Sequence, residues 1–415
     1  MKLKKIFRKM LPDAVALQLK SIINVKSSRK MLAEKEKIRP YKKGHYPPGI
    51  NLIGDIKAET GLGQSIRILA GIMEKSDIPF DIKQTELHGN LERNDDTWER
   101  KITDRVKYDV NVIHWIPETW ARDYNEADSD MLDYRYNIAY WLWELEEFPD
   151  RWVPCIQTVD EIWTPSEFIS NSLRKKTKKP VITVPYAIET AQDDCLDRKY
   201  FSLPEDKFLF LTMYDFISIS ERKNPAAVID AYIKAFPEGN KDVGLVIKIN
   251  HAEDKKLEKL KNKLKDYSNV YFITDNLTRH EVDSLLCVCD VLVSLHRSEG
   301  FGLPLAEAMA LGKPVIATNW SAPTEFMDGE SACLVSYKLI KLKKTIGPYE
   351  KGNYWADADT DHAADYMKKL WEDREYREKI GRNAQTYIKE HLSYEYAAGI
   401  MKDRLKEIYE KDSIC

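Results

Sequence analysis

The chain has 415 residues, of which 43% are hydrophobic and 32% are charged. This balance excludes an intrinsically disordered protein, and the length favours two domains over a single core. Charged residues interrupt every apolar run before it reaches the ~20 residues that a membrane-spanning helix needs. The six cysteines lack CxxC spacing, which excludes a disulfide framework or a cysteine-based zinc site. We therefore expect a globular protein of the cytoplasm.

Charge is distributed unevenly along the chain. The net charge is −3, but residues 1–43 carry 14 Lys or Arg against three acidic residues, and the rest carries 50 basic and 64 acidic residues. A basic segment ahead of an acidic body suits peripheral contact with an anionic surface, such as the inner face of a membrane or a phosphorylated lipid. The same composition fits a solvated tail equally well. Because the body is acidic, no nucleic-acid partner is expected.

The first half of the chain alternates short apolar runs with helical stretches, which is the pattern of an α/β fold with a parallel sheet. A glycine-containing loop at 54–63 separates the first predicted strand from a helix at 64–75. The predicted strands are 50–53, 110–113, 138–141, 161–164 and 182–184. The alternation lapses at 187–204, where we place an interdomain hinge.

A second alternation begins at residue 208. The predicted strands are 208–213, 244–249, 270–273, 291–295 and 314–317, and the predicted helices are 225–235, 279–289 and 303–310. The last 40 residues predict a helix, because apolar side chains from Tyr387 to Ile408 fall on one stripe. The division that follows is a basic segment at 1–45, Rossmann-like domains at 46–195 and 196–390, and a C-terminal helix at 391–415.

The most informative motif, Ser298–Glu307, comes directly after a predicted strand. Its two glycines allow the backbone to approach a ligand closely, and Pro304 suits the first turn of a helix. Unpaired amides at such a helix start bind anions, and a diphosphate is a fitting ligand. Glu299 precedes the loop and Glu307 lies inside the helix, so the two carboxylates can flank one molecule. We expect them to bind sugar and ribose hydroxyls.

A second polar group, Asp215–Pro225, follows the strand at 208–213. Arg222 and Lys223 precede a predicted helix, and cations placed there would neutralise the charge on a departing diphosphate. A solvated basic pair is the alternative. We disfavour it because cations at a helix start oppose the helix dipole.

These residues resemble the retaining glycosyltransferases of the GT-B fold, in particular family four (group 1 glycosyltransferases) and its bacterial envelope-polysaccharide enzymes. The family signature is two Glu separated by seven residues, which Glu299 and Glu307 match, and Lys223 matches the family's diphosphate-binding Lys. The resemblance implies two Rossmann-like domains facing each other across a deep cleft. The first would bind the acceptor, the second would bind the nucleotide-sugar donor, and the C-terminal helix would cross back to the first domain.

The resemblance also implies a role for individual residues. Glu299 would contact donor-sugar hydroxyls and Glu307 would hold the ribose. The family often has an assisting Arg where this chain has Ile217, so Arg222 or Ser218 would take its place. The residues expected to bind the donor are therefore Gly61, Gly63, Ser218, Arg222, Lys223, Glu299, Gly300, Phe301, Gly302, Leu303 and Glu307.

The catalytic position of the first domain is open between two residues. Many family members have a His after the strand that corresponds to 138–141, where this chain has Trp143-Glu144. His114, after the preceding strand, is the nearest His. We favour Glu144, because a lone His at a strand end is more often hydrogen-bonded within a core. The predicted catalytic residues are Glu144, Glu299 and Lys223.

The predicted function is transfer of a hexose-type sugar from a nucleotide diphosphate sugar to a glycan, lipid-linked or protein acceptor, with retention of configuration. No cofactor and no metal are expected, because Lys223 and helix amides supply the positive charge. The DxD triplets at 128–130 and 357–359 follow no convincing strand. The sequence predicts neither the donor sugar nor the acceptor, and it predicts no oligomeric state.

Two alternatives remain at this stage. A nucleotide-sugar epimerase or a phosphorylase would need an acid/base set or a cofactor lysine, and the sequence gives no clear sign of either. A catalytically silent subunit that stabilises an active partner is left open by Ile217 and by the missing His. The intact Glu299, Glu307 and Lys223 oppose it.

Overall fold

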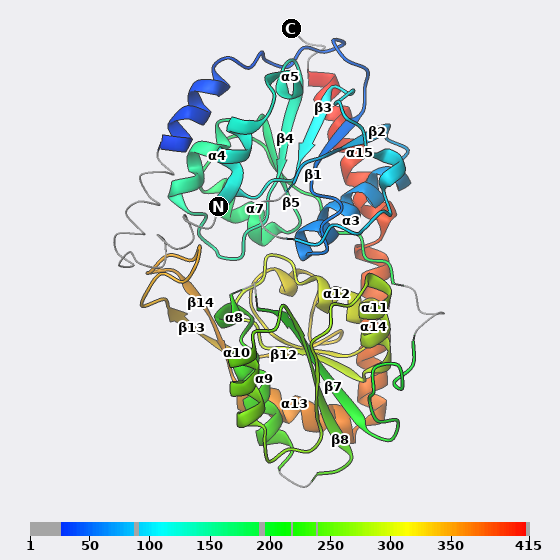
Figure 1. Ribbon diagram of the computed structural model, residues 1–415. Helices are drawn as coiled ribbons and strands as arrows, with labels where there is room; N and C mark the ends of the chain where they lie inside the picture. Colours follow the sequence, from blue (N-terminus) through cyan, green and yellow to red (C-terminus); the bar gives the residue numbers. More distant parts are fainter. Residues whose placement is uncertain (1–25, 87–90, 191–195, 217–218, 238–239, 412–415) are drawn as a thin grey trace.

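The computed structural model describes residues 26–411 except 87–90, 191–195, 217–218 and 238–239. The chain forms two α/β units, one above the other in Figure 1. Ser218 and Ile217, which the sequence analysis singled out, lie outside the described residues, as do residues 1–25 and 412–415. The predicted fold class is confirmed, since each unit contains a six-stranded parallel sheet of Rossmann-like type.

The sheet of the first unit has the strand order β2-β1-β3-β4-β5-β6. Its strands are β1 (Ile50–Gly54), β2 (Phe80–Gln84), β3 (Val110–Ile113), β4 (Tyr136–Tyr140), β5 (Glu161–Thr164) and β6 (Val181–Thr183), and its helices are α3 (Gly61–Lys75), α4 (Pro117–Glu126), α5 (Ser129–Leu132), α6 (Val153–Ile156) and α7 (Glu167–Arg174). Strands β1 and β3 are buried along their whole length, as in parallel sheets covered on both faces. The sequence analysis did not predict β2, whose alternation of apolar and polar residues fits its place at the sheet edge.

The sheet of the second unit has the strand order β12-β11-β10-β7-β8-β9. Its strands are β7 (Phe208–Asp215), β8 (Val243–Asn250), β9 (Val270–Ile273), β10 (Val291–Ser294), β11 (Val315–Thr318) and β12 (Cys333–Val335). Its helices are α8 (Ser220–Lys223), α9 (Pro225–Ala235), α10 (Asp254–Lys263), α11 (Arg279–Val288), α12 (Leu303–Ala310), α13 (Thr360–Glu372) and α14 (Arg374–His391).

Strand order reverses beside the first strand of each unit. In the first sheet the reversal lies between β1 and β3, and in the second it lies between β7 and β10. Ligands of open parallel sheets bind beyond the carboxyl ends of the strands at such a reversal. The fold alone therefore marks the carboxyl ends of β7 and β10 as a binding place.

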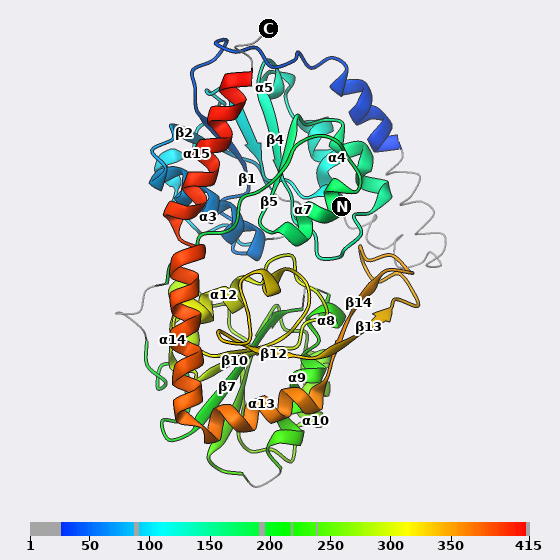
Figure 2. The same ribbon diagram turned by 180° about the vertical axis from the view of Figure 1, so that it is seen from behind.

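The C-terminal region, predicted as one helix, consists of two. Helix α14 runs along the second unit, and α15 (Tyr394–Lys411) continues into the first, where it packs against α3 (Figures 1 and 2). A side chain at Gly71 of α3 would meet the Tyr394 ring at 2.7 Å. Arg404 donates to the buried carboxylate of Glu161 at 2.7 Å. The end of the chain thus ties the two units together.

The described part of the basic segment packs on the first unit. Residues 26–35 form a helix, which the sequence analysis did not predict, and Met31 on this helix is fully buried. The Arg39 amide donates to the Asp133 carboxylate at 2.8 Å. Residues 26–45 are therefore docked, whereas Arg29 and Lys30 remain exposed.

A β-hairpin leaves the second unit and extends toward the first (Figures 1 and 2). It consists of the antiparallel strands β13 (Tyr337–Lys341) and β14 (Tyr354–Ala358), neither of which was predicted. Tyr349 in its loop and Trp355 join the apolar core of the first unit. Within the described residues, no helix is long and apolar enough to cross a membrane.

Candidate functional site

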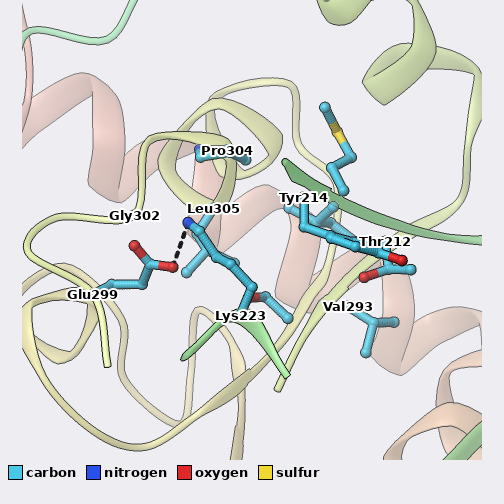
Figure 3. Close-up of a pocket in the computed structure, with 11 residues that line it drawn as sticks. Thr212, Tyr214, Lys223, Val293, Glu299, Gly302, Pro304 and Leu305 are labelled. Atoms are coloured by element: carbon cyan, nitrogen blue, oxygen red, sulfur yellow. Dashed lines mark hydrogen bonds and ion pairs between the residues drawn. The ribbon is translucent and has the colours of Figure 1, made fainter. Parts of the chain in front are cut away.

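A pocket of about 430 Å³, which includes open solvent, lies at the strand-order reversal of the second sheet. Figure 3 shows its lining, which comes from the ends of β7 and β10, from α8 and from the start of α12. The lining residues are Thr212, Met213, Tyr214, Lys223, Leu292, Val293, Ser294, Glu299, Gly302, Pro304 and Leu305. Three residues predicted from the sequence, Lys223, Glu299 and Gly302, therefore meet in one pocket.

Two cations hold the Glu299 carboxylate from both sides. The Lys223 Nζ lies 2.6 Å from Oε1, and the Arg222 guanidinium lies 2.9 Å from Oε2 (the Lys223 contact is dashed in Figure 3). Burial alone would raise the pKa of Glu299, but Arg222 and Lys223 outweigh it and lower the pKa to about 2. The carboxylate is therefore ionised at any physiological pH, and two positive charges stand beside it.

The local backbone explains why Arg222 and Lys223 point into the site. Asn224 adopts a left-handed conformation with φ 53°, which ends α8 and allows α9 to begin at Pro225. The Asn224 side chain donates to the Leu295 carbonyl at the end of β10 at 3.0 Å. Arg222 and Lys223 lie in the last turn of α8 directly before α9, and Arg222 is buried, so the pair is not a solvated surface feature.

Helix α12 presents its amino end to the pocket. Its N-cap is Gly302 with φ 97°, a conformation that favours glycine, and Pro304 occupies the first turn. No side chain caps the first amides of this helix. The Leu305 and Ala306 amides bond to the Gly302 carbonyl at 2.9 Å and 3.3 Å, so α12 offers an anion the positive end of its helix dipole.

A second loop fixes the backbone of Glu299. The Glu299 amide donates to the Ser321 hydroxyl at 2.9 Å, and the Glu299 carbonyl accepts from the Ala322 amide at 3.3 Å. Ser321 is held at φ 67°. Positive φ in a non-glycine residue is uncommon and persists where surrounding contacts fix it. From sequence, the segment 319–326 was expected only as part of the cleft wall, and the contact of Ser321 with Glu299, 22 positions away, could not be foreseen.

The Glu144 carboxylate of the first unit lies near Arg222, Lys223 and Glu299 of the second unit. Its Oε1 lies 3.9 Å from the Arg222 guanidinium, and its Oε2 accepts from the Tyr349 hydroxyl at 3.2 Å. The Ser298 hydroxyl donates to the Glu144 carbonyl, which joins the two units at the motif itself.

The motif loop also touches the first unit through backbone contacts. The Ser166 hydroxyl donates to the Gly300 carbonyl at 2.7 Å. A Cβ on Gly300 would lie 2.5 Å from the Trp143 carbonyl oxygen, so only glycine permits this approach. The units are thus closed on each other around Glu299.

His114, the other candidate, stands apart from this group. It is buried, its Nε2 lies 2.7 Å from the Ser65 hydroxyl, and that hydroxyl lies 2.6 Å from the Tyr186 hydroxyl. Burial lowers the pKa of His114 to about 4, so the ring is neutral near pH 7. The geometry therefore places Glu144, and not His114, beside the cation pair.

Glu307 lies in a different pocket from Glu299. This pocket of about 340 Å³ lies between the two units and is lined by Gln64, Ile68, Ala187, Ile188, Glu189, Arg279, Asp283, Glu307 and Tyr394. Arg279 donates to Glu307 at 2.8 Å. Burial, opposed by Arg279, raises the pKa of Glu307. A ligand that contacts both motif carboxylates must therefore extend from one pocket to the other.

The predicted glycines of the first unit line neither pocket. The Gly63 amide donates to Thr60 at 3.2 Å, and a side chain at Gly63 would collide with the Ala58 carbonyl. Gly61 is the first residue of α3, and a side chain there would meet nothing within 4 Å. Gly63 is thus explained by packing within its own loop.

Two other motif residues serve the apolar core. Phe301 is buried, with its ring 4.8 Å from Tyr186 of the first unit and 5.3 Å from Phe326. Leu303 is half-buried and packs on the same core cluster. Their side chains hold the loop against its surroundings, which leaves their backbone as the part able to meet a ligand.

The aspartates of the second DxD triplet, 357–359, have structural explanations. Asp359 caps α13 by accepting from the His362 amide at 3.2 Å, and Asp357 pairs with Arg297 at 3.0 Å. Asp128 precedes α5. No group of three or more His, Cys, Asp or Glu able to hold a metal occurs in the part of the chain that the structure describes.

The second unit matches a known family. Residues 197–336, which span β7 to β12 with Arg222, Lys223, Glu299 and Glu307, match the family described as glycosyl transferases group 1. The O-antigen biosynthesis glycosyltransferase WclY of Escherichia coli is 32% identical over 142 residues, which are 33% of this chain. The match spans 37% of the length of that relative.

Solved structures resemble nearly the whole chain. HepE of Anabaena, solved in complex with UDP and glucose, aligns with a TM-score of 0.59 at 13% identity, over 87% of this chain and 100% of that one. Sucrose-phosphate synthase from Thermosynechococcus elongatus aligns with a TM-score of 0.62 at 14% identity, over 88% and 100%. The chain has the GT-B fold. The similarity to the glycosyl transferases group 1 family lies in its second unit, over residues 197–336.

Proposed function

We propose that this GT-B protein is a glycosyltransferase that moves a hexose-type sugar from a nucleotide diphosphate sugar to a glycan or lipid-linked acceptor, with retention of configuration. The observation that carries the proposal is the joint hold of Lys223 and Arg222 on Glu299 at the amino end of α12. The group 1 match on the same residues and the likeness to a glycosyltransferase of O-antigen biosynthesis support it.

The chemistry of the pocket suits departure of a nucleoside diphosphate. Negative charge grows on the leaving phosphate as the glycosidic bond breaks, and preorganised cations and amides lower the cost of that charge. Lys223, Arg222 and the positive amino end of α12 are such groups. A bound diphosphate would take Lys223 from Glu299 and leave the carboxylate to accept hydrogen bonds from hydroxyls of the donor sugar.

Two carboxylates have separate roles in this proposal. Glu299 binds donor-sugar hydroxyls, and Glu307 in the second pocket binds the ribose after displacing Arg279. The acceptor enters from the first unit, where Glu144 lies beside the sugar and stabilises its oxocarbenium-like transition state. In a front-face displacement, a donor phosphate oxygen takes the acceptor proton.

Metal independence is part of the proposal, because the cations of the chain already compensate the phosphate charge. The silent-subunit alternative is not favoured, since the whole charged group is assembled and the family match covers it. An acceptor anchored in a membrane would also give the basic segment a purpose. Arg29 and Lys30 are exposed on the helix 26–35 and could contact anionic lipids.

A donor screen tests the function. The wild type is incubated with UDP-, GDP-, dTDP- and ADP-sugars, with and without EDTA, and release of nucleoside diphosphate is measured together with donor binding. Lys223→Ala is compared with a matched control, Lys234→Ala, whose lysine pairs with Asp361 on the surface. Release from one donor that survives EDTA, persists in Lys234→Ala and disappears in Lys223→Ala supports the proposal. Failure of every donor to bind or react contradicts it.

Lipid contact is tested separately by co-sedimentation with vesicles. Vesicles of phosphatidylcholine with about a third of phosphatidylglycerol should retain the wild type and release it at high salt. Arg29→Glu with Lys30→Glu should weaken retention. Equal retention by neutral vesicles would contradict an electrostatic contact.

A further inference from the structure

The hairpin β13–β14 belongs to the donor-binding unit by sequence but packs into the other unit. Tyr349, in the loop between its strands, is 3% exposed, with its ring 5.6 Å from Trp143 of the first unit and 6.3 Å from Trp355 of its own hairpin. Leu342 is also buried in the core of the first unit. The hairpin is therefore part of the contact between the two units and not a solvent-exposed insertion.

The tip of the hairpin is fixed from both units. Arg151 of the first unit donates to the Pro348 carbonyl at 2.7 Å and pairs with Glu350. Gly347 lies against Ile219 at the start of α8, where a side chain would collide with it. Tyr349 is held between these contacts, and its ring has little freedom to turn away.

The Tyr349 hydroxyl is a hydrogen-bond donor aimed at Glu144. It lies 3.2 Å from Glu144 Oε2, while the other carboxylate oxygen lies 3.9 Å from Arg222. Burial and the neighbouring Glu144 raise the pKa of Tyr349 well above its ordinary value, so the hydroxyl keeps its proton. A donor on one oxygen and a cation near the other fix the orientation of the carboxylate.

These contacts form a chain across the two units. It runs from Tyr349 to Glu144, to Arg222, and through Glu299 to Lys223. Four of its members come from the second unit, and Glu144 comes from the first. Glu144 is therefore held in place only when the units are closed, by a residue that the donor unit extends across the interface.

We propose that Tyr349 is a positioning residue of sugar transfer, which holds the Glu144 carboxylate toward Arg222 when the two units close. The inference rests on the proposed function, and it adds a residue outside the matched range 197–336. Because Tyr349 acts on Glu144 and not on the donor pocket, it should govern turnover and leave donor binding unchanged.

Tyr349→Phe tests this with little disturbance, since it removes one hydroxyl and keeps the ring packing. A hydrogen bond to a charged group typically contributes enough for about a ten- to hundredfold fall in kcat. The donor Kd should stay within about twofold. Tyr354→Phe on the same hairpin is the matched control, because Tyr354 is 46% exposed, and its kcat should equal that of the wild type.

A double-mutant cycle with Glu144→Gln identifies the route of the effect. If Tyr349 acts through Glu144, Tyr349→Phe should lower kcat in the wild type and cause little further loss in Glu144→Gln. An unchanged kcat in Tyr349→Phe, a full additional loss in Glu144→Gln, or a weakened donor Kd would each overturn the inference. A wild type that reacts with no donor would instead count against the proposed function, which keeps the two failures distinct.

Discussion

The two faces that meet at the site are built from different chemistry. The donor face of the second unit is charged, with Arg222 and Lys223 around Glu299 and a helix amino end beside them. The face of the first unit is largely uncharged near the motif, with the Trp143 backbone against Gly300 and the Glu144 carboxylate near Arg222. The donor face is thus assembled within one unit, whereas the first unit adds shape and one carboxylate on closure.

The largest expected effect lies on the charged face. Glu299→Gln keeps the shape of the side chain but removes the negative charge that strengthens hydrogen bonds from sugar hydroxyls and balances Lys223. We expect kcat to fall about a hundred- to a thousandfold, the size typical for the loss of one preorganised electrostatic group. Steady-state kinetics with the donor found in the screen measures it. Glu330→Gln, whose glutamate pairs with Lys379 on the surface, should react like the wild type, and equal losses in both variants would refute a specific role of Glu299.

A smaller fall in kcat is expected from a change at the contact between Gly300 of the motif and the Trp143 backbone of the first unit. In Gly300→Ala the new Cβ would lie 2.5 Å from the Trp143 carbonyl oxygen and 3.1 Å from Ile169, so the units must separate slightly. We expect kcat to fall about tenfold, because the residues of the two units would no longer be oriented correctly toward the substrate. We also expect the free energy of unfolding to fall by about 1–3 kcal/mol. Gly329→Ala, which would meet nothing within 4 Å, is the control. Wild-type kcat in Gly300→Ala would show that closure does not require this approach.

The smallest effect concerns the neutral His114 behind the first face. Its folded pKa of about 4 lies below the ordinary value of 6.5, so between these values the unfolded chain binds a proton that the folded chain does not. Stability from His114 is complete above about pH 6.5 and is lost as the pH falls toward about 4. The advantage of the wild type over His114→Gln in free energy of unfolding should shrink by about 2 kcal/mol between about pH 6.5 and pH 5. Urea unfolding at both pH values measures it, and a constant difference would mean that burial does not lower the pKa of the folded ring.

The charged face could be predicted from sequence, as could Glu144 of the first unit, but the contacts that position Glu144 could not. The donor face is local, since Arg222 and Lys223 follow β7 and Glu299 follows β10, and parallel strands bring their carboxyl ends together. The adjacent cations Arg222 and Lys223 and the Glu299 motif were enough to predict a binding site for a phosphate-containing ligand. The separation of Glu299 and Glu307 into two pockets was not visible, because the direction of each side chain depends on the turn at Gly302.

The face of the first unit depends on contacts between residues far apart in the chain. Tyr349 meets Glu144 across 205 positions, and its hairpin resembles an ordinary polar loop in sequence. Gly63 was expected to bind the donor because the family resemblance implies it, and the structure shows a second reason for glycine there, since a Cβ would collide with the Ala58 carbonyl. Strand β2 and the short helix at 26–35 were not predicted. An edge strand and a helix that packs on the surface of a domain each contain few apolar residues, so their sequence patterns are weak.

The central claim is that Lys223 holds the donor diphosphate and that Glu299 occupies its place until the donor arrives. The most direct measurement is the Kd of the nucleoside diphosphate for the wild type, Lys223→Met and Glu299→Gln, by isothermal titration. The account predicts that Lys223→Met weakens binding at least about tenfold. Glu299→Gln, which removes a negative charge beside the phosphate, should bind as tightly as the wild type or more tightly while losing transfer. Weaker binding in Glu299→Gln, or unchanged binding in Lys223→Met, would contradict the account.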